Sequence, residues 1–263
     1  QRLSRGLGDV YKRQAEEAVD AGVETLIFIT GRNKFSIPNH FDKAYEIETE
    51  LERRKKIKEL ELVNVLPSNI KCIYIRQNQA LGLGHAVLCA KPAVGNNPFA
   101  VILADDMILA KTNGCLKQMA EKYIELNSSI IAVEKVKKEY LHKYGIIQGS
   151  KINQTDWELK NIIEKPEIEN APSDMGVVGR YILNASIFDI LENTKKGAGE
   201  EIQLTDALAS QITKEKVYAY EFEGKRFDCG NKLGFLKATI EYGLHHGELS
   251  EDLKDYLKNL DLG

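Results

Sequence analysis

An apolar run that ends in two acidic residues constrains the fold of this chain more than any other stretch. The run is FAVILADDMIL, Phe99 to Leu109, in which Asp105 and Asp106 directly follow apolar residues. Such a short, β-branched run is typical of a strand buried on both faces, as in a parallel sheet. Ligands of open α/β sheets bind beyond the carboxyl ends of the strands, so an acid there can hold a hard cation against a phosphate. The alternative is an acidic turn that only ends a strand.

Composition limits the classes of partner. The 263 residues carry a formal net charge of −3, so the chain has no basic field for nucleic acid or an anionic membrane. No apolar run approaches the roughly 20 residues that span a bilayer, and the first residues lack the apolar core of a signal peptide. The cysteines lack the spacing of a zinc site, which predicts reduced thiols in a cytoplasmic protein: Cys72, Cys89, Cys115 and Cys229.

The organisation of the chain changes at Ala15. Residues 1–14, QRLSRGLGDVYKRQ, are basic and show no usable periodicity. A helix from Ala15 through Ala21 and a strand from about Thr25 to Thr30 follow. Residues 15–263 contain no internal repeat and no low-complexity linker, which predicts one α/β domain. A doubly wound domain normally begins with a strand ahead of its first helix, and no such strand is visible in the sequence before Ala15.

Two segments after the first strand have distinct patterns. The stretch Asp42 to Glu61 predicts one long, charged helix, either a solvated excursion or a partner-binding helix. Beyond a predicted strand, Gly82 and Gly84 open a helix, where backbone N–H groups can meet a base or an anion. A plain turn is the alternative for these glycines, and His85 after them fits a nucleotide contact or a capping role.

Further acidic and basic residues fall at predicted strand ends. Glu164 and Lys165 end a strand at Pro166, and Asp228 lies in the segment KRFDCG. Each of these taken singly fits a solvated ion pair or an acidic turn. Together with Asp105 they form a convergence that a purely structural α/β domain does not require.

The whole series of segments resembles one family, the bacterial UTP-glucose-1-phosphate uridylyltransferases, also called UDP-glucose pyrophosphorylases. The resemblance runs from about Ala15 to His246. Nine segments in register carry it: AGVETLIFITGR, HFDKAYEIETELERR, RQNQALGLGHAVLCAKP, VILADDMI, YGII, IIEKP, GVVGRYIL, GEEIQLTDAL and FDCGNKLGFLKATIEYGL.

The resemblance implies an α/β, Rossmann-like nucleotidyltransferase fold, a mixed and mostly parallel sheet flanked by helices. It implies magnesium as the cofactor and UTP and glucose 1-phosphate as the substrates, joined as UDP-glucose with release of pyrophosphate. A homo-oligomer, dimer or tetramer, is implied as well. Matching positions give Asp105 and Asp228 as Mg²⁺ ligands, Gln77 and Gly82 as uracil contacts, Gly145, Glu164 and Gly179 as glucose contacts, and Lys165 as a phosphate contact. Asp105, Lys165 and Asp228 are thus the expected catalytic residues.

The chemistry agrees with these residue types. A sugar 1-phosphate is mostly dianionic at neutral pH, because its second pKa is about 6, so it attacks without a general base. The reaction needs alignment of the attacking oxygen with the α-phosphorus of UTP and cancellation of the charge of two anions. A related pyrophosphorylase that uses dTTP or another hexose phosphate is one alternative. A non-catalytic sugar-nucleotide-binding protein is another.

The chain departs from the family at its amino terminus. The family has a strand and a glycine-rich loop with an arginine before the first helix, and Gly6-Leu7-Gly8 followed by Asp9 does not match that loop. The comparison with the family therefore implies that residues 1–14 are a non-native or artefactual segment, joined to a domain at residues 15–263 that is truncated at its amino terminus. We therefore expect the sheet to lack a central strand, with neighbouring edges exposed. Triphosphate binding, stability and turnover of this chain should be impaired for the same reason.

Overall fold

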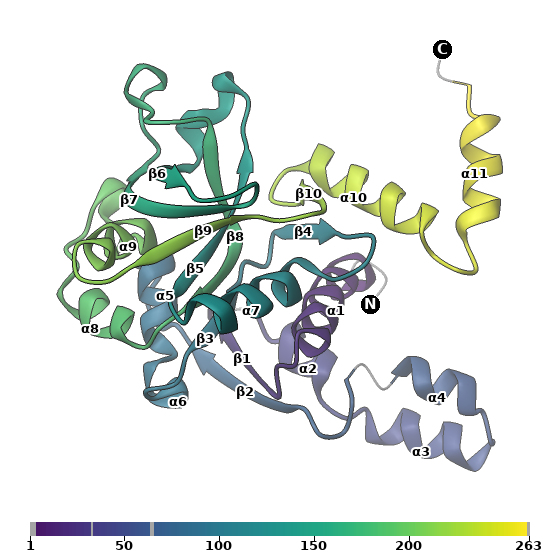
Figure 1. Ribbon diagram of the computed structural model, residues 1–263. Coiled ribbons are helices and arrows are strands. Elements are labelled where there is room, and N and C mark those ends of the chain that lie inside the picture. The colour runs from purple at the N-terminus through teal and green to yellow at the C-terminus, as the bar shows by residue number, and fades with distance from the viewer. Residues whose placement is uncertain (1–3, 33, 64–65, 262–263) are drawn as a thin grey trace.

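The computed structural model describes residues 4–32, 34–63 and 66–261. Its centre is a six-stranded sheet in the order β3-β8-β5-β9-β7-β6 (Figure 1). The strands are β3 (Phe99–Ile102), β5 (Ser129–Lys135), β6 (Gly145–Lys151), β7 (Asp156–Glu164), β8 (Met175–Leu183) and β9 (Val217–Glu221). Two further sheets have two strands each, β1 (Thr25–Thr30) with β2 (Lys71–Arg76), and β4 (Asp106–Leu109) with β10 (Lys225–Asp228).

Helices cover both faces of the central sheet, and the alternation of β5 shows why. Ile131 and Val133 face one core, formed with α5 (Leu83–Cys89), α8 (Ser186–Asn193) and α9 (Leu204–Ile212). Ile130 and Ala132 face the other core, formed with α1 (Ser4–Asp20) and α7 (Cys115–Leu126). Each large apolar side chain removed from water contributes about 1.5–3 kcal/mol, so a strand buried on both faces is apolar throughout.

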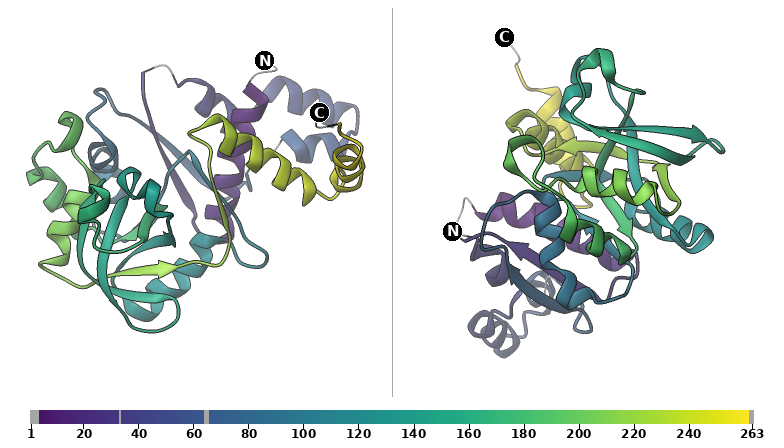
Figure 2. Two further views of the ribbon diagram at one scale, coloured as in Figure 1. Left: turned by 90° about the horizontal axis from the view of Figure 1, so that it is seen from above. Right: turned by 90° about the vertical axis from the view of Figure 1, so that its left-hand side faces the viewer.

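The remaining helices are short or lie at the periphery. They are α2 (Ser36–Phe41), α3 (Tyr45–Arg53), α4 (Ile57–Val63), α6 (Lys91–Val94), α10 (Lys232–Leu244) and α11 (Ser250–Lys258), with 3₁₀ turns η1 (Lys138–Lys143), η2 (Ile168–Asn170) and η3 (Ala198–Glu200). The pairs α3–α4 and α10–α11 project on the same side, away from the six-stranded sheet (Figures 1 and 2). Within the described ranges, no helix has the length and apolarity needed to cross a membrane.

The sheet is mixed, as predicted, but the expectation of mostly parallel pairing was wrong. Only β1–β2 and β5–β9 pair in parallel among the described strands, and the other pairings are antiparallel. The reason is that β8 runs antiparallel between β3 and β5, and β6 and β7 form a hairpin. The strand predicted in the run that begins at Phe99 also differs from a strand buried on both faces, because β3 ends at Ile102, is half-buried and lies at the sheet edge.

The first helix begins earlier than the sequence pattern predicts. Helix α1 starts at Ser4 and passes through Ala15 without a break. Gln14 is buried, and its Nε2 donates to the carbonyl oxygens of Leu103 at 2.9 Å and Ala104 at 2.8 Å. The boundary at Ala15 is therefore not a boundary of secondary structure. The non-native origin of residues 1–14 and the single domain at 15–263 stay predictions, and residues 1–3 lie outside the described ranges.

The two-stranded sheet β1–β2 is separate from the central sheet. In the described part of the chain, no strand pairing joins β1 or β2 to β3. Ile27 and Ile29 of β1 instead pack against the core that α5 helps to form. The lack of a central strand stays a prediction.

Candidate active site

Asp105 and Asp106 lie at the turn between β3 and β4 and enter different surroundings. Asp106 is buried; one of its oxygens, Oδ2, accepts the backbone N–H of Gly179 at 2.7 Å, and Oδ1 accepts Nε of Arg226 at 2.7 Å. Asp105 is exposed. Since Asp106 is buried and both of its oxygens are bound inside the protein, this residue has a structural role, whereas the exposed Asp105 can meet a ligand. Asp228 is half-buried; its Oδ1 accepts the N–H of Gly230 at 2.9 Å and its Oδ2 accepts Nδ2 of Asn231 at 3.0 Å, both at the surface.

The structure brings Asp105 and Asp228 together across the β4–β10 pair. Asp228 pairs with Asp106 in the antiparallel register, and the next residue, Cys229, donates its N–H to the carbonyl of Asp105 at 2.7 Å. A Cβ placed on Gly230 would lie 3.0 Å from Asp228 Oδ1 and 3.1 Å from Asp105 Oδ2. The two carboxylates therefore flank one small space that a side chain at Gly230 would fill.

The surroundings of Asp105 disfavour its negative charge. The pKa of Asp105 is raised, first by desolvation and then by the neighbouring charges of Asp106 and Asp228. A divalent cation favours oxygen ligands, and Mg²⁺ is commonly held by one or two carboxylates with the remaining ligands from water and phosphate. The carboxylate pair and the space at Gly230 fit such an ion. In the described ranges no cluster of three acidic, histidine or cysteine side chains offers a closed metal site.

The predicted uracil contacts lie together beyond the carboxyl end of β2. Gln77 Nε2 donates to the carbonyl of Gly82 at 3.1 Å and lies 3.0 Å from Nδ1 of His85. Gly82 precedes α5 with φ of 95°, a left-handed conformation that favours glycine. The glycine loop predicted from the sequence is thus present, and its nucleotide contacts stay a prediction.

A substitution at Gly82 should disturb this loop. A Cβ there would lie 2.7 Å from the Cβ of Glu201 and 2.9 Å from the carbonyl oxygen of Ile202. We expect Gly82→Ala to lower the free energy of unfolding by about 1–3 kcal/mol, from backbone strain and overpacking, measured by urea titration. Gly31→Ala is the control, because its Cβ would meet nothing within 4 Å. Equal stability of the two variants would contradict the close approach.

The predicted sugar contacts Gly145 and Glu164 face each other across the β6–β7 hairpin. They are paired in register, and a Cβ on Gly145 would lie 3.2 Å from Glu164 Oε2 and 3.3 Å from Thr205 Oγ1. Lys165 follows with φ of 45°, and its Nζ lies 3.3 Å from Glu164 Oε1. The Lys165 side chain is half-exposed, so its ammonium can reach an anion from the solvent side.

Gly179, the third predicted sugar contact, lies on β8 against the Asp105–Asp106 turn. Its N–H donates a hydrogen bond to Oδ2 of Asp106, and its carbonyl accepts one from the N–H of Leu103 at 2.9 Å. A Cβ there would lie 2.7 Å from Asp106 Oδ2. Glycine at this position therefore makes room for the buried carboxylate, and its contact with glucose stays a prediction.

The site contains two further residues that the sequence pattern did not indicate, Arg226 beside Asp106 and Thr205 beside Gly145. The Arg226 side chain is nearly buried; burial alone lowers its pKa, yet the ion pair with Asp106 and further hydrogen bonds raise it overall. Its place two residues before Asp228 on a strand was the only signal in the sequence. Thr205 lies on α9, in the segment GEEIQLTDAL that carries the resemblance.

Cys229 lies beside the carboxylate pair and should react slowly. Burial, followed by the charges of Asp106 and Asp228, raises its pKa to about 11. At pH 8 only about one thiol in a thousand is then the reactive thiolate. We expect Cys229 to be alkylated by iodoacetamide roughly 100-fold more slowly at pH 8 than in the urea-unfolded chain, as followed by mass spectrometry, with the rate rising toward pH 11. Rapid alkylation of the folded chain at pH 8 would contradict this.

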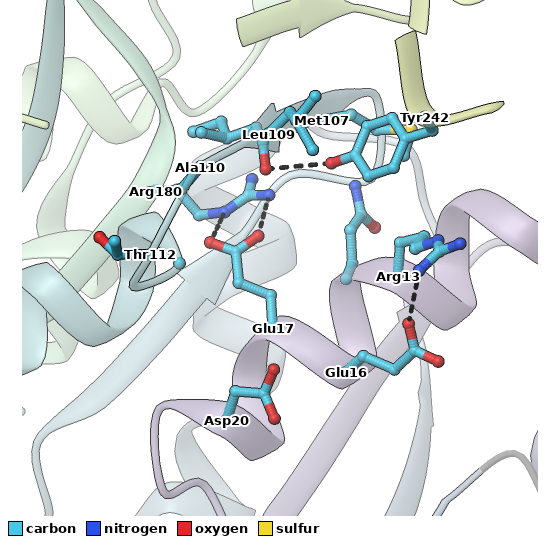
Figure 3. Close-up of a pocket in the computed structure, with 13 residues that line it drawn as sticks. Arg13, Glu16, Glu17, Asp20, Met107, Leu109, Ala110, Thr112, Arg180 and Tyr242 are labelled. Atoms are coloured by element: carbon cyan, nitrogen blue, oxygen red, sulfur yellow. Dashed lines mark hydrogen bonds and ion pairs between the residues drawn. The ribbon is translucent and has the colours of Figure 1, made fainter. Parts of the chain in front are cut away.

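A separate cavity of about 200 Å³ lies between α1, β4 and α10 (Figure 3). It contains the ion pair of Glu17 with Arg180, and none of the predicted site residues lines it. The carboxylate pair and the hairpin at Glu164 therefore remain the candidate site, because their side chains match the chemistry of a sugar phosphate and a cation.

The fold and this site together define a nucleotidyltransferase. The family described as nucleotidyl transferase matches residues 7–243. A UTP–glucose-1-phosphate uridylyltransferase of Staphylococcus epidermidis is 44% identical over 247 residues, covering 94% of this chain and 85% of that protein. One of Bacillus subtilis is 43% identical over 245 residues, covering 93% and 84%. The chain belongs to the family of UTP–glucose-1-phosphate uridylyltransferases, which confirms the resemblance.

Solved structures agree with this assignment. A UTP-bound UDP-glucose pyrophosphorylase of Acinetobacter baumannii superimposes with a TM-score of 0.88 at 40% identity, covering 96% of this chain and 88% of that one. A UDP-glucose pyrophosphorylase in complex with UDP-glucose superimposes with a TM-score of 0.81 at 40% identity, covering 90% of this chain and 87% of that one. The predicted nucleotidyltransferase fold is confirmed.

Proposed function

We propose that this chain transfers a uridylyl group from UTP to glucose 1-phosphate, yielding UDP-glucose and pyrophosphate, with Mg²⁺ as cofactor. The observation that carries the proposal is the convergence of Asp105 and Asp228 on the space beside Gly230. The named substrates and products of the relatives support the choice of reactants.

The carboxylate pair would hold the cation. When bound, Mg²⁺ neutralises phosphate charge and orients the reacting oxygens. Asp105 and Asp228 would supply two of its ligands, leaving the others to water and phosphate oxygens. Asp106 would keep the turn in place and would not touch the ion, since it is buried and bound to Gly179 and Arg226.

The hairpin at Glu164 would orient the sugar phosphate. Glu164 is an acceptor for sugar hydroxyls, and Lys165 beside it offers a positive charge to the phosphate. No general base is required, because the attacking phosphate oxygen is already ionised at neutral pH. Gln77 and Gly82 would meet the uracil at the other end of the site. Catalysis then depends on alignment and charge neutralisation.

The test is formation of UDP-glucose by the purified chain, followed by chromatography with Mg²⁺ or with EDTA. UTP is compared with dTTP, and glucose 1-phosphate with galactose 1-phosphate. We expect product with UTP and glucose 1-phosphate, and only with Mg²⁺, at a rate lowered because residues 1–14 do not match the family's triphosphate-binding loop. A preference for dTTP or galactose 1-phosphate would refute the substrate assignment. Binding of UDP-glucose without any turnover would favour a non-catalytic sugar-nucleotide-binding protein.

We also infer a cytoplasmic location, which the free thiols of the described cysteines support. The dimer or tetramer implied by the resemblance stays a prediction, which analytical ultracentrifugation tests.

A further inference from the structure

We propose that Arg226 is a positioning residue that holds the Asp105–Asp228 pair at the spacing of one metal ion and couples it to the sugar-binding hairpin. The proposal rests on the proposed function, because it takes these two carboxylates as the metal ligands. Among the described residues, the hydrogen bonds and ion pairs of the Arg226 side chain go to other groups and not to these two carboxylates.

The first contact of Arg226 is with the turn that carries Asp105. Its Nε and Nη2 lie 2.7 Å and 2.6 Å from Oδ1 of Asp106, and both side chains are less than 10% exposed. The second oxygen of Asp106 is fixed by the Gly179 N–H on β8. Through Asp106, Arg226 therefore connects β10 to β8 of the six-stranded sheet.

This connection matters because β4 and β10 are short. Each strand has four residues, and in the described chain the two pair only with each other. A two-stranded unit of this length is marginal without further support. Asp106 is opposite Asp228, and Arg226 is opposite Ile108, so the ion pair links diagonal positions of the ladder. It thereby fixes the end of β10, where Asp228 lies, against the turn of Asp105.

The second contact of Arg226 is with the sugar side of the site. Its Nη1 donates to Glu134 Oε1 at 2.8 Å and to the hydroxyl of Tyr144 at 3.1 Å, and its guanidinium lies over the Tyr144 ring. The carbonyl of Tyr144 accepts the N–H of Lys165 at 3.0 Å. One guanidinium thus contacts the segments that present the metal pair and the segment that presents Lys165.

Arginine is suited to this position and lysine is not. The planar guanidinium has five donors in a fixed arrangement, so it can meet Asp106, Glu134 and Tyr144 at once. A lysine ammonium keeps the charge and loses the fixed geometry. The Arg226→Lys variant therefore tests position separately from charge.

The experiment measures Mn²⁺ binding, as a probe of the Mg²⁺ site, by electron paramagnetic resonance with UDP-glucose present. We expect Arg226→Lys to raise the Mn²⁺ dissociation constant at least tenfold. Without the fixed contacts of the guanidinium, the Asp105 and Asp228 carboxylates repel each other and do not keep the spacing that one ion requires. The uridylyl transfer rate should fall with it, more in kcat than in the KM for UTP.

Arg180→Lys is the matched control. Arg180 is a buried arginine that meets Glu17 through two hydrogen bonds, at 3.1 Å and 2.8 Å, and contacts neither Asp105 nor Asp228 in the described contacts. Both lysine variants should lower the thermal unfolding temperature, and only Arg226→Lys should weaken Mn²⁺ binding. An unchanged Mn²⁺ affinity in Arg226→Lys, or an equal loss in both variants, would overturn the proposal.

Tyr144→Phe provides a milder test if Arg226→Lys does not fold. It removes the hydroxyl that Nη1 meets and keeps the ring on which the guanidinium lies, and we expect a two- to fivefold weaker Mn²⁺ affinity. An unfolded Arg226→Lys together with unchanged affinity in Tyr144→Phe would refute the positioning role. Lack of Mn²⁺ binding by the wild-type chain would instead refute the metal site of the proposed function.

Discussion

Replacing Asp228 with asparagine is expected to reduce Mg²⁺-dependent uridylyl transfer by about a thousandfold, and to lose one of the two hydrogen bonds that the carboxylate accepts from Gly230 and Asn231. The side chain keeps its shape and loses the charge that would bind the cation beside Asp105. Metal stabilisation of transition-state charge is worth several kcal/mol, and about 4 kcal/mol corresponds to a thousandfold in rate. Asp105→Asn should behave in the same way, since the two carboxylates flank one space.

The rate is measured as UDP-glucose formed per enzyme over a range of Mg²⁺ concentrations. Asp189→Asn is the matched control, because Asp189 is an exposed aspartate whose ion pair with Lys91 lies at the surface. It should keep the wild-type rate. Wild-type turnover by Asp228→Asn or Asp105→Asn would refute the metal assignment.

The candidate site was predictable to the extent that it depends on residues at strand ends. Asp105, Glu164 and Asp228 were identified because acids directly follow or end apolar strands, and the structure brings Asp105 and Asp228 together. Arg226 was not identified, because its partner Asp106 is 120 residues away in sequence. Local patterns do not encode which side chains meet across such a separation.

Strand direction was likewise beyond the sequence pattern. A strand buried on both faces is apolar whether its neighbours run parallel or antiparallel, so the apolar β8 gave no sign of its direction between β3 and β5.

The charged helix predicted over Asp42 to Glu61 is two helices, α3 and α4. Lys55 between them has φ of 55°, a left-handed conformation at a residue that gives no turn signal.

Replacing Glu17 with glutamine should destabilise the folded chain more than Gly82→Ala or Asp228→Asn does. Glu17 of α1 makes a two-point ion pair with Arg180, whose side chain is 0% exposed (Figure 3). The same carboxylate accepts the N–H of Leu116 at the start of α7. Removing one partner of a buried pair leaves an uncompensated charge, which costs about 3–5 kcal/mol. That is a large part of the roughly 5–15 kcal/mol that typically stabilises a domain.

Urea titration of Glu17→Gln measures this loss, and two further variants identify its cause. Glu16→Gln is the control, since Glu16 pairs only with the partly exposed Lys12 and Arg13 in the described contacts, and its free energy of unfolding should change by less than about 0.5 kcal/mol. The double variant Glu17→Gln/Arg180→Met should recover much of the loss, because it removes the buried charge as well. The loss would not come from an unpaired charge at Arg180 if the free energy of unfolding fell by less than about 1 kcal/mol in Glu17→Gln, or if the double variant were less stable than the single one. Recovery of stability in the double variant would instead show that each charge of the Glu17–Arg180 pair is required mainly to neutralise the other in the protein interior. The pair and the Glu17–Leu116 hydrogen bond then hold α1 against β8 and α7.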